Sequence, residues 1–206
     1  MKDTKLTQIK NKMRLTEITT LYETPSFKGY RCTRSGSAFT FSFSIFFSPN
    51  LVCLAGDCGH LMLALNWDYA LPWLRGSRDS LQYLLEKIPY EIKQSYLEFD
   101  AESACALVRE PLKELKEQLE EGLISQEAYD TIEEKLENFC EKCLEMDHER
   151  DFYEEYLSLC DELDIYVELE NIHVTKYTDA LWHKVAQLQE FCRLYEERES
   201  KNAENL

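Results

Sequence analysis

The chain has 206 residues, of which 44% are hydrophobic, and it carries a formal net charge of −16. The length allows one or two domains with an apolar core. The composition argues against wholesale disorder, and the absence of a long apolar run argues against a membrane span or a secretion signal. An acidic chain of this kind is not expected to bind nucleic acid directly.

The N-terminal half begins with a polar segment and continues with strand signals. Residues 1–18 show little apolar periodicity and are expected to form a basic arm or a frayed helix. Phe39, Phe41, Phe43 and Ile45 then alternate with polar residues, as in a strand with one covered face. Turns are expected at residues 48–50 and 56–59. The expected strands are residues 30–33, 38–47, 51–54 and 60–65.

Helical spacing replaces alternation after Asp68. Gly122 ends a leucine-lined helix and Ser125 caps the next one, which predicts an αα-hairpin with antiparallel helices. Residues 165–174 are expected to be extended and residues 200–206 disordered. The expected helices are residues 78–88, 98–108, 111–121, 126–146, 150–163 and 178–199. The second helix of the hairpin carries a heptad-like seam of Tyr129, Ile132, Leu136, Phe139, Cys143 and Met146.

These elements predict an α+β fold. A small N-terminal antiparallel β-meander, packed by a helix, is followed by an acidic helical region that contains the αα-hairpin. We expect residues 1–95 to form the first domain and residues 96–206 the second. Packing of both into one compact domain is the alternative.

The stretch LVCLAGDCGH contains candidate metal ligands at Cys53, Cys58 and His60. A zinc site needs three or four converging ligands, and alternation along strands would separate these three side chains. Asp57 is expected to bond backbone N–H groups of the turn rather than act in catalysis. We therefore predict a turn with reduced thiols and no metal or cofactor site. All eight cysteines of the chain are expected to be reduced and mostly buried.

Other reactive residues are also expected to be structural. Cys140 and Cys143 form a C-x-x-C pair in the middle of an acidic helix, whereas redox pairs lie at a helix N-terminus. The four histidines are far apart, with no catalytic spacing. Trp73 and Leu74, together with Trp67, are expected to anchor the sheet to its first helix, or to form a partner-binding aromatic patch.

Charge is the most unusual property of the sequence. Residues 1–95 hold 12 Lys/Arg and 8 Asp/Glu, a balance of +4, whereas residues 96–206 hold 11 and 31, a balance of −20. Such an excess costs self-repulsion that solubility alone does not require, and it would attract a basic surface. The carboxylates expected to bind a partner flank the hairpin: Glu117, Glu120, Glu121, Glu133, Glu134, Glu137, Glu141 and Glu145.

The segments FSFSIFFSPNLVCLAGDCGHLMLAL and LPWLRGS, with the helix from Tyr83 to Ile88, carry a resemblance. This pattern of strand, GDxG turn, strand, aromatic stretch and Tyr-x-x-x-Lys helix resembles one in small phage and prophage proteins. The resemblance covers roughly residues 30–90. It implies a mobile-element origin but no particular chemistry.

Together these observations predict a phage-encoded, non-enzymatic inhibitor of a bacterial defence complex, in the style of anti-CRISPR proteins, acting in the host cytosol. Its acidic helices would occupy a basic groove of a nucleic-acid-binding protein or ribonucleoprotein, either as a nucleic-acid mimic or as a wedge. An oligomerisation or assembly factor, with a homodimer as one form, is an alternative. A hydrolase that uses carboxylates, such as Asp57, and a divalent ion is another.

Overall fold

The computed structural model describes residues 2–13, 15–34, 41–65, 70–166 and 173–204. The chain divides into two compact units: the first contains residues 1–96 and 177–206, and the second contains residues 97–176. The predicted second domain, 96–206, therefore needs a correction at its C-terminal end. The last helix belongs to the first unit because its apolar residues cover the sheet there.

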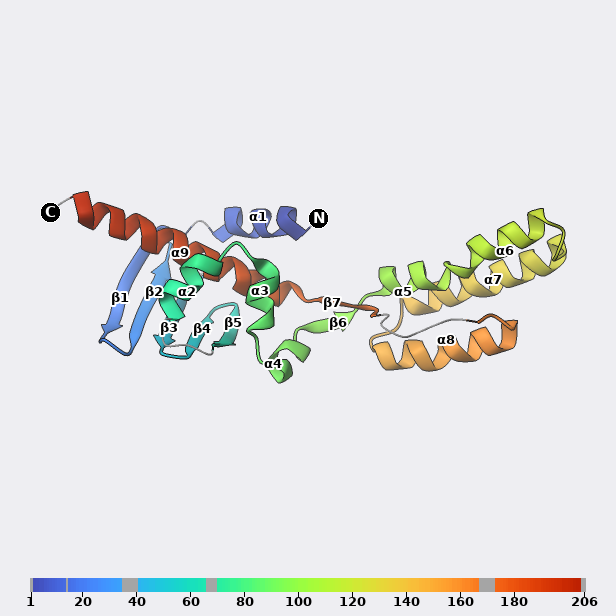
Figure 1. Cartoon of the computed structure of the whole chain (residues 1–206), viewed down its shortest axis with the longest axis horizontal. Coiled ribbons are helices and arrows are strands. Elements are labelled where there is room, and N and C mark those ends of the chain that lie inside the picture. The colour runs from blue at the N-terminus through green and yellow to red at the C-terminus, as the bar shows by residue number, and fades with distance from the viewer. Residues whose placement is uncertain (1, 14, 35–40, 66–69, 167–172, 205–206) are drawn as a thin grey trace. The chain divides into compact units, whose positions relative to one another are not determined.

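The first unit is built on a five-stranded antiparallel meander in which neighbouring strands follow the chain order (Figure 1). An α+β fold is thereby confirmed, with one strand more than the three or four predicted. The additional strand at the edge was missed because six of its seven residues are exposed and it shows no alternation. The strands are β1 (Glu17–Glu23), β2 (Lys28–Thr33), β3 (Phe43–Ser48), β4 (Leu51–Gly56) and β5 (Gly59–Ala64).

Alternation along the central strands creates an apolar inner face. In β3 the side chains of Phe43, Ile45 and Phe47 are buried, and Ile45 pairs with Tyr30 of β2 and Leu54 of β4. The predicted strand at 38–47 begins later than expected. Phe41 has a φ of 71° and lies before β3, and Phe39 lies outside the described residues.

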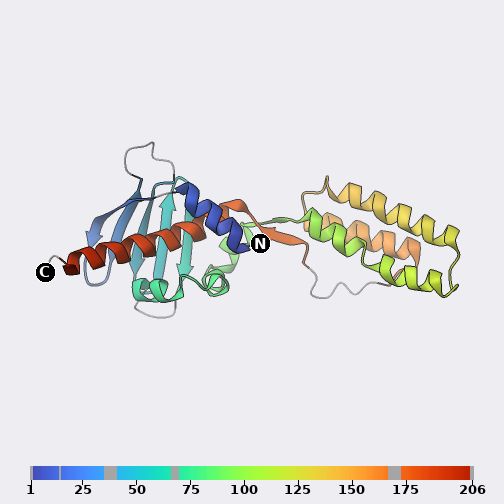
Figure 2. The ribbon, with the colours of Figure 1, turned by 90° about the horizontal axis from the view of Figure 1, so that it is seen from above.

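The C-terminal helix α9 (Asp179–Glu204) covers this face (Figure 2). Tyr30 is fully buried, and its ring lies 5.5 Å from the rings of both Phe191 and Tyr195. The guanidinium of Arg198 lies 5.1 Å from the centre of the Tyr30 ring. Each large apolar side chain buried in this way contributes about 2 kcal/mol.

The two ends of the first unit are more ordered than expected. Of the two alternatives predicted for this segment, an arm or a frayed helix, the structure has a helix: α1 (Lys2–Met13) packs against α9 and buries Leu6, Ile9 and Met13 at helical spacing. The C-terminal residues are also helical as far as Glu204, where disorder was predicted from residue 200.

Three short helices follow the sheet: α2 (Ala70–Ser77), α3 (Leu81–Glu86) and α4 (Tyr90–Gln94). The predicted helix at 78–88 corresponds to α3, which is shorter. Leu74 of α2 is fully buried, Trp73 packs against the same core, and α2 contacts β3 and β4, so their predicted anchoring role is confirmed. Trp67 lies outside the described residues.

The second unit is helical. Its helices are α5 (Ala101–Val108), α6 (Pro111–Glu120), α7 (Gln126–Cys143) and α8 (Glu149–Leu163). The strands β6 (Leu97–Phe99) and β7 (Thr175–Tyr177) pair with each other, and the N–H of Asp100 donates to the carbonyl of Val174 at 2.7 Å. The N-terminal and C-terminal segments of the second unit are therefore hydrogen-bonded to each other. Residues 167–172 of the predicted extended segment lie outside the described residues.

The predicted hairpin is present, with α6 packed against α7. The Ser125 hydroxyl caps α7 by accepting from the N–H of Ala128 at 3.2 Å. Leu136, Phe139 and Cys143 of the seam are buried against α5 and α8, inside the unit. These seam residues are consequently not available for pairing with another chain.

Gly56 provides a test of the sheet. A Cβ at Gly56 would lie 2.6 Å from Cα of Phe43 on the neighbouring strand, whereas a Cβ at Gly76 in α2 would meet nothing within 4 Å. Gly56→Ala should lower the free energy of unfolding by about 2 to 3 kcal/mol, because backbone must move. Gly76→Ala, the matched control, should raise it by up to about 1 kcal/mol. Urea denaturation measures both, and equal midpoints would contradict the close approach.

Candidate functional site

The turn at residues 56–59 is held by backbone contacts. Oδ2 of Asp57 accepts a hydrogen bond from the N–H of Ser42 at 3.1 Å, and Gly59 adopts a φ of 88°. Asp57 therefore has a structural role, but its carboxylate binds the backbone of Ser42, the residue before β3, and not the N–H groups of its own turn as predicted.

The turn also contacts a buried lysine that sequence reasoning missed. Lys184 of α9 is 2% exposed, and its Nζ donates to the carbonyls of Cys58 at 2.6 Å and Ala180 at 3.2 Å. Nζ also lies 4.9 Å from the centre of the Tyr96 ring. Burial lowers the pKa of Lys184, a property that amine nucleophiles share. These two hydrogen bonds tie α9 to the turn.

The predicted metal-ligand candidates do not converge. Cys53 pairs in register with Met62, and His60 pairs with Ala55, while Cys58 lies in the turn. Within the described residues, no group of three or more His, Cys, Asp or Glu side chains could hold a metal ion. The described helices also include none long and apolar enough to cross a membrane.

The outer face of the sheet, opposite α9, carries an uncharged row across all five strands. The register aligns Tyr22, Gly29, Phe46, Cys53 and Met62. Tyr22 is 55% exposed, and Phe46, Cys53 and Met62 are half-buried. The Phe27 ring extends the row, stacked 6.1 Å from the ring of Phe46. We call these six residues the outer row.

The acidic charge gathers in the second unit. Residues 97–176 hold 7 Lys/Arg and 25 Asp/Glu, a balance of −18, while the first unit holds 16 and 14, a balance of +2. The division into units thus separates the charges more sharply than the predicted boundary did. The helical unit has a strongly negative potential, and the sheet unit is nearly neutral.

The basic side chains of the unit can neutralise only 7 of its 25 carboxylates. Five of its seven basic side chains already form ion pairs, and the other two, Lys113 and Lys116, are exposed on α6. The pairs are Arg109–Glu137, Lys135–Glu162, Lys142–Glu155, Arg150–Glu154 and Lys176–Asp100.

The eight predicted glutamates differ in their surroundings. Glu137 is held by two hydrogen bonds from Arg109, at 2.6 and 2.5 Å, and these bonds lower the pKa of its carboxyl. Glu133 is half-buried and accepts from the Tyr129 hydroxyl at 3.2 Å. The remaining six are exposed: Glu117, Glu120, Glu121, Glu134, Glu141 and Glu145. Glu137 is therefore the weakest of the eight candidates.

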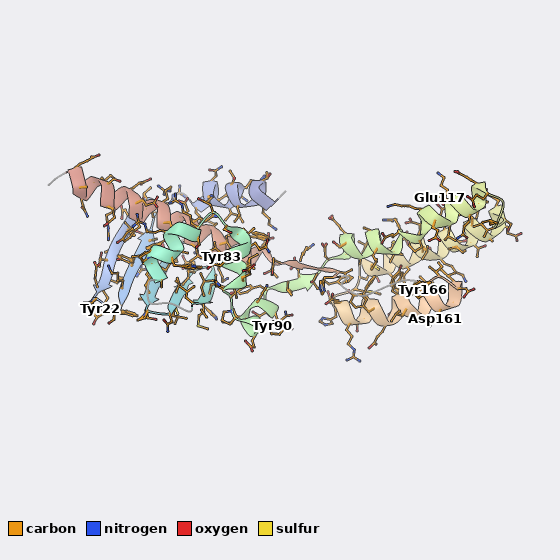
Figure 3. The ribbon with its side chains drawn as sticks, viewed as in Figure 1. Tyr22, Tyr83, Tyr90, Glu117, Asp161 and Tyr166 are labelled. Atoms are coloured by element: carbon orange, nitrogen blue, oxygen red, sulfur yellow. The ribbon has the colours of Figure 1, made fainter. Side chains whose placement is uncertain are left out.

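The exposed carboxylates extend beyond the predicted set. On α7, Glu127 and Asp130 are exposed and extend the row of Glu134 and Glu141 towards the N-terminus, at spacings of three, four and seven residues. On α8, Asp161 is exposed on the side of the unit opposite Glu117 of α6 (Figure 3). The negative charge thus surrounds the helical unit and is not confined to the flank of the hairpin.

A groove of about 550 Å³ also lies within this unit. It is lined by residues from the ends of α5 and α8 and from α6, and Tyr166 at its edge is 85% exposed. Sequence reasoning did not find this groove because its walls come from three separate segments.

Comparisons with protein-family models, with curated proteins and with solved structures found no match for this chain. The function must therefore be inferred from the chain itself.

Thiol reactivity tests the structural role of the C-x-x-C pair. Burial raises the pKa of Cys140 and of Cys143 to about 12, so only about one thiol in 10,000 is ionised at pH 8. Iodoacetamide at pH 8 should modify the half-buried Cys53 and Cys58 first, and Cys140 and Cys143 only after unfolding. Peptide mass spectrometry over time measures this order. Rapid modification of Cys140 or Cys143 in the folded protein would indicate a reactive pair.

Proposed function

We propose that the helical unit binds a basic protein surface that otherwise holds nucleic acid. The observation that carries the proposal is the balance of −18 in 80 residues, with five of the seven basic side chains already paired. The biological setting that fits is a phage-encoded inhibitor of a bacterial defence complex, of the anti-CRISPR kind, acting in the host cytosol.

The distribution of charge favours mimicry of nucleic acid over a wedge. Carboxylates repeat every three or four residues along α7, which corresponds to one charge per about 5 Å of helix axis. Together α6, α7 and α8 hold 15 Asp/Glu and 5 Lys/Arg, a balance of −10. Over the length of α7, about 27 Å, this is one net charge per about 3 Å, within a factor of two of the value of about 1.7 Å for duplex DNA. A groove built for a polyanion would be attracted to this unit from any side.

The proposal predicts which proteins the chain captures. Proteins retained from a bacterial lysate on the immobilised chain at low salt should be nucleic-acid-binding, and added duplex DNA or RNA should displace them. Glu117→Gln, Glu121→Gln, Glu134→Gln and Glu141→Gln together should reduce the retained amount at least about tenfold, because each contact removed weakens an electrostatic complex. Quantitative mass spectrometry of the eluates measures this loss.

A variant with the same net charge provides the control. Glu17→Gln, Glu86→Gln, Glu91→Gln and Glu204→Gln neutralise four exposed carboxylates of the first unit and should leave capture intact. Circular dichroism should show unchanged helix content in both variants. We call the fourfold Glu117, Glu121, Glu134 and Glu141 variant the hairpin variant. The proposal would be excluded if the hairpin variant retained as much bacterial protein as the unaltered chain and nucleic acid displaced none of it.

A second candidate function, assembly of this chain with a copy of itself, is favoured by the outer row. An uncharged row that crosses all five strands can pack against its own copy without burying unpaired charges. The heptad seam, in contrast, packs within the second unit.

Light scattering coupled to size exclusion tests this candidate. A dimer held by the outer row should persist at high salt, because apolar burial is not screened. Phe46→Ser should convert it to monomer, whereas Ser44→Ala, two residues away on the same strand and the same face, should not. A monomer at all salt concentrations would eliminate self-assembly through the sheet.

A further inference from the structure

The groove in the second unit combines an apolar floor with an acidic rim. Leu107, Leu115 and Ile165 supply apolar surface, and Glu110, Glu114 and Asp164 supply carboxylates. The three carboxylates are exposed, and none of the ion pairs within the described residues involves them. The described residues that line the groove include no lysine or arginine, so the charged groups among them are all carboxylates.

Helix ends add to the negative potential of the groove. α5 ends at Val108, beside Leu107, and α8 ends at Leu163, beside Asp164, so the negative dipole ends of two helices lie at its walls. The N-terminal end of α6 at Pro111 acts in the opposite direction. Its first turn, however, is flanked by Glu110 and carries Glu114, and these carboxylates offset its positive end.

The size of the groove selects the kind of occupant. A volume of about 550 Å³ exceeds that of one ammonium or guanidinium head, and it matches sites that take several groups at once. The long apolar stem of a lysine or arginine side chain can lie on the apolar floor, while its charged head reaches the carboxylates of the rim. The ring of Tyr166 offers a further contact for a cation.

We propose that this groove receives a partner segment in which an arginine or lysine stands beside an apolar residue. This proposal rests on the proposed function. The overall negative charge of the unit attracts the partner, and the groove is the place where specific contacts hold it. Interfaces concentrate binding energy in a few such desolvated pockets, with near-neutral contacts around them. The acidic outer faces would then guide the partner, and the groove would hold it.

Peptide binding to the full chain tests the groove. The probes are a fluorescent peptide that alternates arginine with leucine, and a second in which serine replaces each leucine at equal charge. Fluorescence polarisation should show the leucine peptide binding at least about tenfold more tightly. Glu110→Gln, Glu114→Gln and Asp164→Asn together should weaken that binding about tenfold or more. Asparagine tolerates the φ of 55° at residue 164, so this variant should fold normally.

A matched variant separates the groove from general charge. Glu102→Gln, Asp147→Asn and Asp151→Asn remove three exposed carboxylates of the same unit that do not line the groove. They should weaken peptide binding by less than about twofold. Tyr166→Ala should weaken it selectively, since this exposed ring supports no core packing.

Two results would contradict binding of a partner segment in the groove without contradicting the proposed function. Equal losses in the two triple variants would mean that attraction is diffuse, and equal binding of the leucine and serine peptides would mean that the apolar floor plays no part. Failure of the proposed function has a different signature: the hairpin variant would then capture bacterial proteins as well as the unaltered chain does.

Discussion

The fold depends on covering the apolar inner face of the five-stranded sheet. The strands place Tyr30, Ile45 and Leu54 on that face, and α9, from the far end of the sequence, supplies the residues that bury them. Because the covering helix must return to the sheet, everything between residues 96 and 177 is an insertion. The charges follow the same division, because α9 buries much of its surface against the sheet, whereas α7 and α8 carry rows of carboxylates on their outer faces.

Sequence reasoning predicted the elements whose periodicity reflects one buried face. β3 and the α6–α7 hairpin are in this group, with the Ser125 cap at its predicted place. It failed where the buried face is small or short. Six of the seven residues of β1 are exposed, and in α1 the buried Leu6, Ile9 and Met13 stand among polar residues. It also placed α9 with the acidic helices, because a long-range return of the chain leaves no local signal.

The candidate surface was partly predictable for a related reason. Net charge is a sum over the sequence, so the acidic excess was evident without coordinates. Which carboxylates are neutralised depends on tertiary neighbours: Arg109 reaches Glu137 across 28 positions of sequence. The groove beside Tyr166 and the buried Lys184 are likewise products of segments that meet only in the folded chain.

The meeting of the two ends of the second unit has a thermodynamic consequence. The bond between Asp100 and Val174 closes a long loop, and the entropy lost on closing a loop grows only with the logarithm of its length. The sheet therefore bears almost the same entropic burden whatever number of residues the inserted helices contain. A segment in this position can lengthen, shorten or change its charge over evolution, while the scaffold that carries it keeps its own stability.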